Sequence, residues 1–188
     1  FDLREYNAFA ASPLAYAGNV ILPLGGSGRG VAAFKRETGA VVWRSDPLAM
    51  GPGSPILIDL DGHQELVVWG QGELAGLNPD DGRLLWKHSH PTQMGLNIST
   101  PVWTPDHRLF VSSAYGGGSR MMQVSRSGGR TAVQNVWADN RMRLHFGTAL
   151  RVGDLIVGSS GDFGPAFMAA VRVDTGAEVW RDRTFARA

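Results

Sequence analysis

A glycine followed four residues later by a tryptophan recurs along this chain, and this spacing constrains the fold more than any other feature. Three copies are regular and one is stretched: Gly39 with Trp43, Gly82 with Trp86, Gly176 with Trp180 and, at the longer spacing, Gly129 with Trp137. Consecutive glycines lie 43, 47 and 47 residues apart. A repeat of this length is typical of a β-propeller, in which each copy forms one four-stranded blade. The sequence therefore predicts four blades.

The composition is that of a folded domain and excludes several classes of function. Apolar residues make up 43% of the 188 residues, and charged residues make up 19%. The 18 basic side chains nearly balance the 17 acidic ones and no long run of one sign occurs, so nucleic acid is not an expected partner. Cysteine is absent, which rules out disulfides and thiolate chemistry within this chain.

The chain offers no apolar run of 18 residues, so we expect no transmembrane helix in it. It begins Phe1-Asp2-Leu3-Arg4-Glu5, which resembles neither a signal peptide nor a translation start. We expect it to be a piece of a longer protein.

Within each copy, short apolar runs alternate with turns. The second copy shows the order: Ser54-Pro55, an Asp61-Gly62 turn, the run 66–68, a glycine-rich break at 70–72, and a third run that begins at Leu74. In every copy the third run begins eight residues before the turn glycine. This pattern predicts antiparallel hairpins of buried strands. The predicted fold is all-β, a single partial propeller over residues 1–188 with four-stranded antiparallel blades near 12–44, 54–87, 100–138 and 148–181.

The repeat also resembles a known family. Residues 33–39 with Trp43, and residues 170–176 with Trp180, resemble the A-x-D-x-x-T-G-x-x-x-W signature of pyrroloquinoline-quinone (PQQ)-like propeller repeats. The position of the aspartate is taken by Lys35, Asn78 and Ser125 in the first three copies. In that family the signature lies at contacts between blades, so we expect its glycines and tryptophans to be structural.

The resemblance implies an eight-bladed ring, as in quinoprotein alcohol dehydrogenases and in the propeller lipoprotein of the outer-membrane β-barrel assembly machinery. The remaining blades are then expected in the parent chain. It also implies a periplasmic or cell-envelope location in bacteria. An open half ring exposes unpaired blade faces, so the isolated chain is expected to be poorly stable or to associate with itself.

The strand order predicts where a binding surface lies. Loops between second and third strands share one face of a propeller with the linkers between blades, and loops on a rigid scaffold commonly carry function. The residues that this argument singles out are Arg29, Tyr115, Arg120, Asn97, Arg143 and Phe163.

Two metal sites are alternatives that the sequence leaves open. His88, His90 and His145 come from neighbouring linkers and have a spacing compatible with a three-histidine site, or they are ordinary solvated linker histidines. Residues 59–65 contain three carboxylates around a glycine, but a hairpin turn occupies the same place in the other copies. The turn is the favoured interpretation.

Two functions follow from the resemblance. The first is a non-catalytic scaffold for protein partners or for cell-envelope assembly, which requires no cofactor. The second is part of a PQQ- and calcium-dependent alcohol dehydrogenase, with Trp103 as the candidate for stacking on the quinone. No constellation of catalytic residues occurs in the chain, and whether the protein is an enzyme stays open, with the scaffold favoured.

Overall fold

The computed structural model describes residues 10–24, 30–162 and 164–184, and over these it is built from strands and turns. Sixteen strands form four sheets, each of four antiparallel strands in chain order. The all-β propeller fold with four-stranded blades is therefore confirmed. Among the described residues no helix is long and apolar enough to cross a bilayer.

Each blade is one continuous stretch of chain. Blade 1 comprises β1 (Leu14–Tyr16), β2 (Asn19–Pro23), β3 (Val31–Lys35) and β4 (Val41–Arg44). Blade 2 comprises β5 (Ile56–Leu60), β6 (His63–Trp69), β7 (Glu73–Leu77) and β8 (Leu84–Ser89). Blade 3 comprises β9 (Val102–Thr104), β10 (Arg108–Ser113), β11 (Gly118–Ser127) and β12 (Arg130–Asp139). Blade 4 comprises β13 (Leu150–Val152), β14 (Leu155–Ser160), β15 (Phe167–Arg172) and β16 (Glu178–Asp182).

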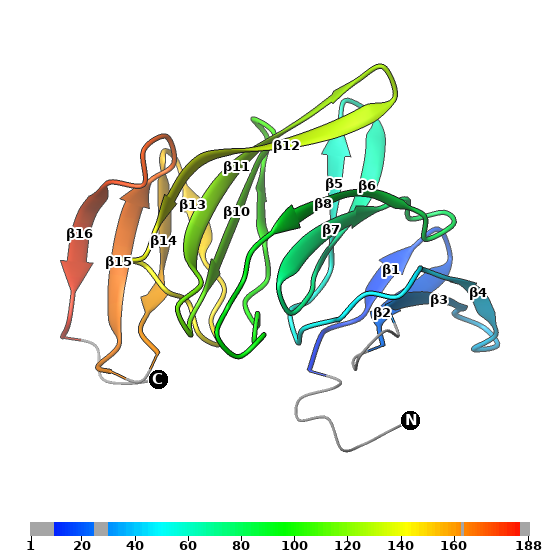
Figure 1. The fold of residues 1–188 in the computed structure, drawn as a ribbon, viewed down its shortest axis with the longest axis horizontal. Helices are drawn as coiled ribbons and strands as arrows, with labels where there is room; N and C mark the ends of the chain where they lie inside the picture. Colours follow the sequence, from blue (N-terminus) through cyan, green and yellow to red (C-terminus); the bar gives the residue numbers. More distant parts are fainter. Residues whose placement is uncertain (1–9, 25–29, 163, 185–188) are drawn as a thin grey trace.

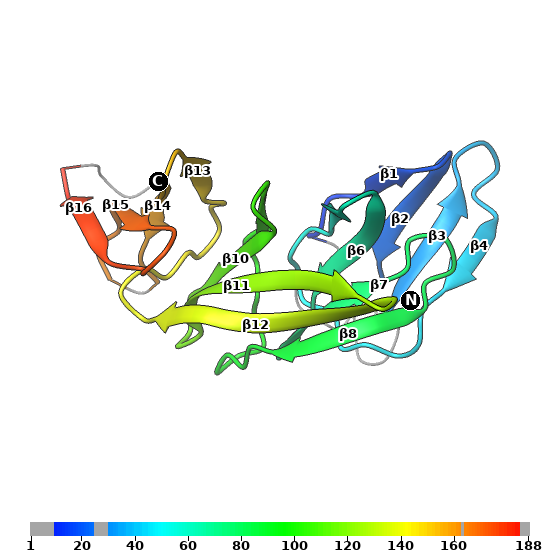
Figure 2. The same ribbon diagram turned by 90° about the horizontal axis from the view of Figure 1, so that it is seen from above.

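The four blades stand side by side in an open row, with blade 1 at one end and blade 4 at the other (Figures 1 and 2). Three hydrophobic clusters lie along this row, one at each junction between neighbouring blades. Because side chains alternate between the two faces of a strand, each inner blade contributes to two of these clusters. The core is therefore divided among the junctions.

The residues in the turns determine the geometry of the hairpins. At the β5–β6 turn, Asp61 has φ 56° and Gly62 has φ 87°, the left-handed pair that a tight two-residue hairpin requires. The Asp59 carboxylate accepts a hydrogen bond from the Gly62 N–H at 2.8 Å. These carboxylates thus serve a turn, while Glu65 is fully buried elsewhere in the blade.

The tryptophan motif joins blades 1 and 2. The Trp43 indole donates a hydrogen bond to the Pro79 carbonyl at 3.1 Å, and its ring lies over Gly82 in the β7–β8 turn. A Cβ at Gly82 would lie 2.5 Å from the ring. Glycine is required here both for this approach and for its φ of 76°.

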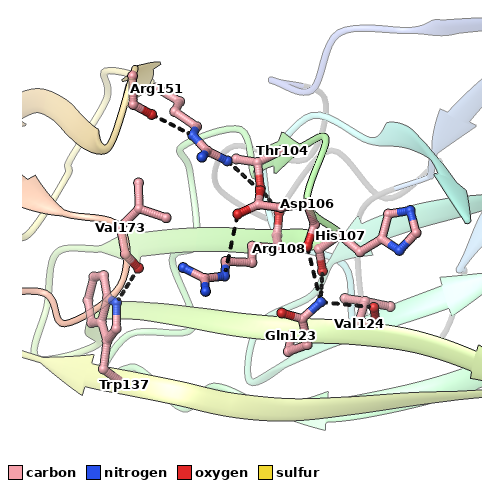
Figure 3. Close-up of polar contacts among 10 residues, drawn as sticks. Thr104, Asp106, His107, Arg108, Gln123, Val124, Trp137, Arg151 and Val173 are labelled. Carbon is pink, nitrogen blue, oxygen red and sulfur yellow. Dashed lines mark hydrogen bonds and ion pairs between the residues drawn. The ribbon is translucent and has the colours of Figure 1, made fainter.

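The junction of blades 3 and 4 repeats the arrangement. Trp137 donates to the Val173 carbonyl at 2.8 Å, and its ring lies over Gly176, where a Cβ would be 2.7 Å away. Figure 3 shows this contact beside a polar cluster that also links the two blades, in which Arg151 of β13 contacts the Asp106 carboxylate. Two independent contacts thus hold blade 4 to blade 3.

The junction of blades 2 and 3 is built differently. The β11–β12 hairpin is ten residues long on each side and projects beyond the other turns (Figure 1). Gly129 lies at its tip, where an added Cβ would meet nothing within 4 Å. Trp86 therefore does not lie over the next blade's turn glycine. Its ring lies over Gly76 of its own blade, and its indole donates to the buried Glu65 carboxylate at 2.6 Å.

Glu65 is held from both blades. Thr131 of β12 donates a hydrogen bond to it, and the Arg126 guanidinium lies 3.6 Å away on β11. A buried carboxylate is tolerated only when it is paired and hydrogen-bonded, and these contacts meet that need. The stretched third repeat thus replaces an apolar ring-on-glycine contact with a buried polar one.

Candidate functional site

The linkers between blades and the loops between second and third strands form one surface, which we call the linker face. The linkers are residues 45–55, 90–101 and 140–149, and the loops are 70–72, 114–117 and the described part of 161–166. Backbone hydrogen bonds tie each linker to a loop. The His90 N–H donates to the Gly72 carbonyl at 2.8 Å, the Gln93 N–H to Tyr115 at 3.0 Å, and the Gly161 N–H to Arg143 at 3.0 Å.

An aromatic cluster made of Tyr115, His145 and Phe146 lies on this face. The Tyr115 hydroxyl and His145 Nε2 are 2.5 Å apart, and the His145 ring centroid lies 3.9 Å from that of Phe146. Phe146 is 74% exposed, and Met94 on the preceding linker is 61% exposed. Tyr115 has φ 53° and Gly116 has φ 81°, a left-handed pair like Asp61 and Gly62, so this conformation belongs to the tight turn between β10 and β11.

A polar pocket of about 280 Å³ lies on the same face, between blade 3 and the linker that precedes it. Its lining is Pro91, Gly116, Gly117, Ser119, Arg120, Ala138, Asp139 and Asn140. Arg120 is fixed by a hydrogen bond to the Ser89 carbonyl at 2.8 Å. Hydrogen bonding and ion pairing with Arg141 hold the pKa of Asp139 below its usual range, so this carboxylate is ionised at neutral pH.

The three histidines are not brought together. His90 is fully buried, where its Nε2 lies 2.9 Å from the Ser113 hydroxyl and its ring meets Trp69 edge-on at 5.1 Å. Burial, together with the charges of Arg120 and His88, lowers the pKa of His90 to about 3, so it is neutral at physiological pH. Within the described part of the chain, no three His, Cys, Asp or Glu side chains are grouped to hold a metal ion. The three-histidine interpretation therefore has no geometric support.

His88 is half-buried. Burial and the nearby charge of Arg120 lower its pKa from the ordinary value, which favours the neutral imidazole.

Asn97 departs from its predicted place on the binding surface. It is fully buried, and its amide donates to the Gly70 carbonyl at 2.7 Å. Its role is to anchor the linker against the preceding loop.

Arg143 is partly exposed and forms an ion pair with Asp162 at 3.3 Å. Arg29 and Phe163, the other two predicted residues, lie outside the described residues.

Trp103 lies on β9, the innermost strand of blade 3. Its ring stacks on His107, with centroids 5.8 Å apart and planes inclined by 11°. It also packs against the cluster between blades 2 and 3. The stacked imidazole covers one face of the indole.

Sequence reasoning missed Phe146 and Met94. Both occupy linkers of irregular length, where no periodic pattern distinguishes an exposed apolar residue from a buried one. The one available signal was an aromatic residue next to glycine, at Phe146-Gly147, outside any apolar run.

A comparison with known protein families identifies the family of this chain. The family described as outer membrane protein assembly factor BamB matches residues 4–182. The chain belongs to the BamB family. Among curated proteins, none matches this BamB-family chain.

Solved structures similar to this BamB-family chain share its fold. BamB from Moraxella catarrhalis is 19% identical with a TM-score of 0.68, and the match covers 94% of this chain and 52% of that one. The quinohemoprotein alcohol dehydrogenase ADHIIG from Pseudomonas putida HK5 is 20% identical with a TM-score of 0.54, covering 95% and 25%. The dihydro-heme d1 dehydrogenase NirN is 13% identical with a TM-score of 0.59, covering 92% and 37%. The chain thus spans about half the length of the BamB structure it resembles.

Proposed function

We propose that this chain is part of a non-catalytic scaffold in the bacterial cell envelope, which binds a protein component of outer-membrane protein assembly through its linker face. Membership of the BamB family supports the assembly role and the envelope location. Neighbours of similar fold include both BamB and dehydrogenases. The choice between a scaffold and a dehydrogenase therefore depends on the residues of the candidate site. The proposal requires neither PQQ nor calcium.

The observation that carries the proposal is the exposed apolar surface on the linker face. Phe146 and Met94 are large, exposed and attached to linkers held by backbone hydrogen bonds. Aromatic residues and methionine are enriched at protein interfaces, where their burial supplies much of the binding energy. The polar pocket beside Arg120 provides hydrogen-bonding groups at the rim of this surface.

Site-specific crosslinking in cells tests the proposal. A photoreactive phenylalanine replaces Phe146 in the full-length parent protein, and the control carries it at Arg83, an exposed residue of the β7–β8 turn on the opposite face. We expect position 146 to capture a component of the outer-membrane assembly machinery and position 83 not to capture it. Equal capture at both positions, or no such component at 146, would refute the role of this face.

A second measurement separates the scaffold from the dehydrogenase. The parent protein is titrated with PQQ and calcium while its tryptophan fluorescence is followed. We expect no saturable quenching at high micromolar quinone. Quenching that saturates near one equivalent would instead favour the dehydrogenase and call for a screen of alcohols.

A further inference from the structure

Arg120 follows a row of buried side chains on β11. Alternate residues of a strand point to the same face, so Arg120 shares its face with Met122 and Val124. Both of these are fully buried in the cluster between blades 2 and 3. Arg120 lies two residues nearer the linker face, where it lines the polar pocket. Its guanidinium therefore lies at the mouth of the junction between blades 2 and 3.

The guanidinium of Arg120 is held in place, but most of its donors are unused. One N–H donates to the Ser89 carbonyl of blade 2 at 2.8 Å. A guanidinium carries five N–H donors. The Nε–H of Arg120 has no acceptor within the part of the chain that the structure describes. A cation with a fixed orientation and free donors is suited to bind an anionic group.

Arg120 differs from the other half-buried arginines. Each of those has a carboxylate oxygen no more than 3.6 Å from its guanidinium; they are Arg108, Arg126, Arg143, Arg151, Arg172 and Arg181. Among the described residues, no carboxylate forms an ion pair with Arg120. Removing a charge from water costs free energy unless the charge is paired. The missing carboxylate is therefore expected from outside the chain.

The other ionisable groups at the pocket do not neutralise Arg120. Asp139 lines the pocket, but both of its carboxylate oxygens accept hydrogen bonds from Arg141, one from the backbone N–H and one from Nε at 2.7 Å. Arg141 thus balances the charge of that carboxylate. Burial and the charge of Arg120 lower the pKa of both His88 and His90, which favours their neutral forms. The pocket therefore keeps the positive charge of Arg120.

The size and lining of the pocket suit a side chain. Sites for small-molecule ligands have volumes of about 300–1,000 Å³ and are lined mostly by apolar side chains. This pocket has about 280 Å³, and Pro91 and Ala138 are the apolar members of a lining otherwise made of glycine and polar residues. A short acidic side chain matches both its size and its charge.

The pocket adjoins the exposed apolar residues of the linker face. Gly116 in its lining follows Tyr115 of the aromatic cluster. A Cβ on Gly116 would lie 3.3 Å from the Gln93 side-chain amide, and Gln93 precedes Met94. One segment of a partner can therefore cover Met94 and reach Arg120 at the same time.

We propose that this pocket binds an aspartate or glutamate side chain of the protein partner. The inference rests on the proposed function and adds to it the chemistry that selects the partner. The carboxylate accepts hydrogen bonds from Arg120, while a neighbouring apolar residue of the partner packs on Met94 and Phe146. The apolar contacts contribute affinity, and Arg120 contributes specificity for an acidic segment.

Photocrosslinking from position 146 of the full-length parent protein in cells tests the role of Arg120. Arg120→Gln keeps a hydrogen-bond donor but removes the charge, so we expect capture to fall about tenfold, with a larger fall in Arg120→Glu. Arg120→Lys keeps the charge and should retain part of the capture. The matched control is Arg172→Gln, which removes the charge of a half-buried arginine on the opposite face and should leave capture unchanged.

A charge exchange separates recognition of the partner from a purely structural role of Arg120. A photoreactive residue in place of Pro91, which is exposed and lines the pocket, identifies the contacting segment by mass spectrometry of the crosslinked peptide. We expect that segment to contain an aspartate or a glutamate. Changing this residue to arginine should lower capture by the parent protein and restore capture by Arg120→Glu.

The outcomes distinguish this inference from the proposed function. Capture at position 146 that Arg120→Gln does not change, or a crosslinked segment without a carboxylate, would overturn the acidic site and leave the scaffold role standing. A loss of capture in Arg120→Glu that the partner's arginine does not restore would assign Arg120 to the junction between blades and would also overturn the site. No capture at position 146 of the otherwise unaltered protein would refute both proposals together.

Discussion

The tryptophan motif predicts that one substitution has very different effects at two copies of the same sequence pattern. Trp137→Ala removes a ring that lies over Gly176, approaches Phe110 with centroids 6.0 Å apart, and donates to the Val173 carbonyl at 2.8 Å. Tryptophan-to-alanine changes in cores cost about 3 to 5 kcal/mol of unfolding free energy. Since Trp137 is only partly buried, we expect about 3 kcal/mol.

Trp180→Ala is the matched comparison. Trp180 has no following blade and no hydrogen-bond acceptor among the described residues, so we expect a loss below about 1 kcal/mol in the monomer. Trp137→Phe separates the two contributions at the buried copy. It keeps most of the apolar contact but loses the hydrogen bond, which is worth about 1 kcal/mol.

The assay is urea unfolding followed by circular dichroism at low protein concentration, where self-association does not contribute. Circular dichroism is preferred because the substitutions remove a fluorophore. If Trp137→Ala and Trp180→Ala lower the unfolding free energy equally, the stabilisation does not come from the neighbouring blade. The reasoning about the motif would then be wrong.

Two further predictions follow from the structure. Gly76→Ala places a Cβ 2.0 Å from the Trp86 indole nitrogen, so we expect a loss of about 3 kcal/mol in urea unfolding, while Gly72→Ala, in open space, should be nearly neutral. The pKa of His90 is about 3 in the folded chain against an ordinary 6.5, so the unfolded chain takes up the proton first. Lowering the pH from 7.5 to 5.5 should therefore cost about 1.4 kcal/mol of stability through this group. His90→Gln should lose that part of the pH dependence, as urea unfolding at both pH values would show.

Much of the architecture could be predicted because the same pattern of strands and turns occurs in four copies of the repeat. Equal spacing between the third strand and its turn glycine located the blades, since a hairpin tolerates few lengths. The contacts at the junction of blades 2 and 3 could not be predicted. The sequence showed a longer interval between Gly129 and Trp137, but not that lengthening this hairpin would leave Trp86 without its glycine and direct it to Glu65.

The sequence predicted which face of the blades carries the candidate site, but not which residues of that face are exposed. Strand order alone placed Tyr115 and Arg120 beside the linkers, because alternate connections must lie on the same side of a sheet. Which linker side chains point outward depends on irregular backbone. Asn97 and His90 were therefore interpreted as surface residues although both are buried, and Phe146 was overlooked.

The buried carboxylate of Glu65 makes one junction unlike the others. The contacts of Trp43 and Trp137 use features that any copy of the repeat can supply, so blades on either side of them could be exchanged by recombination. A blade placed after blade 2 must bring its own Thr131 and Arg126, because otherwise a charge is left buried without partners. Blades 2 and 3 should therefore be inherited, and engineered, as a single unit.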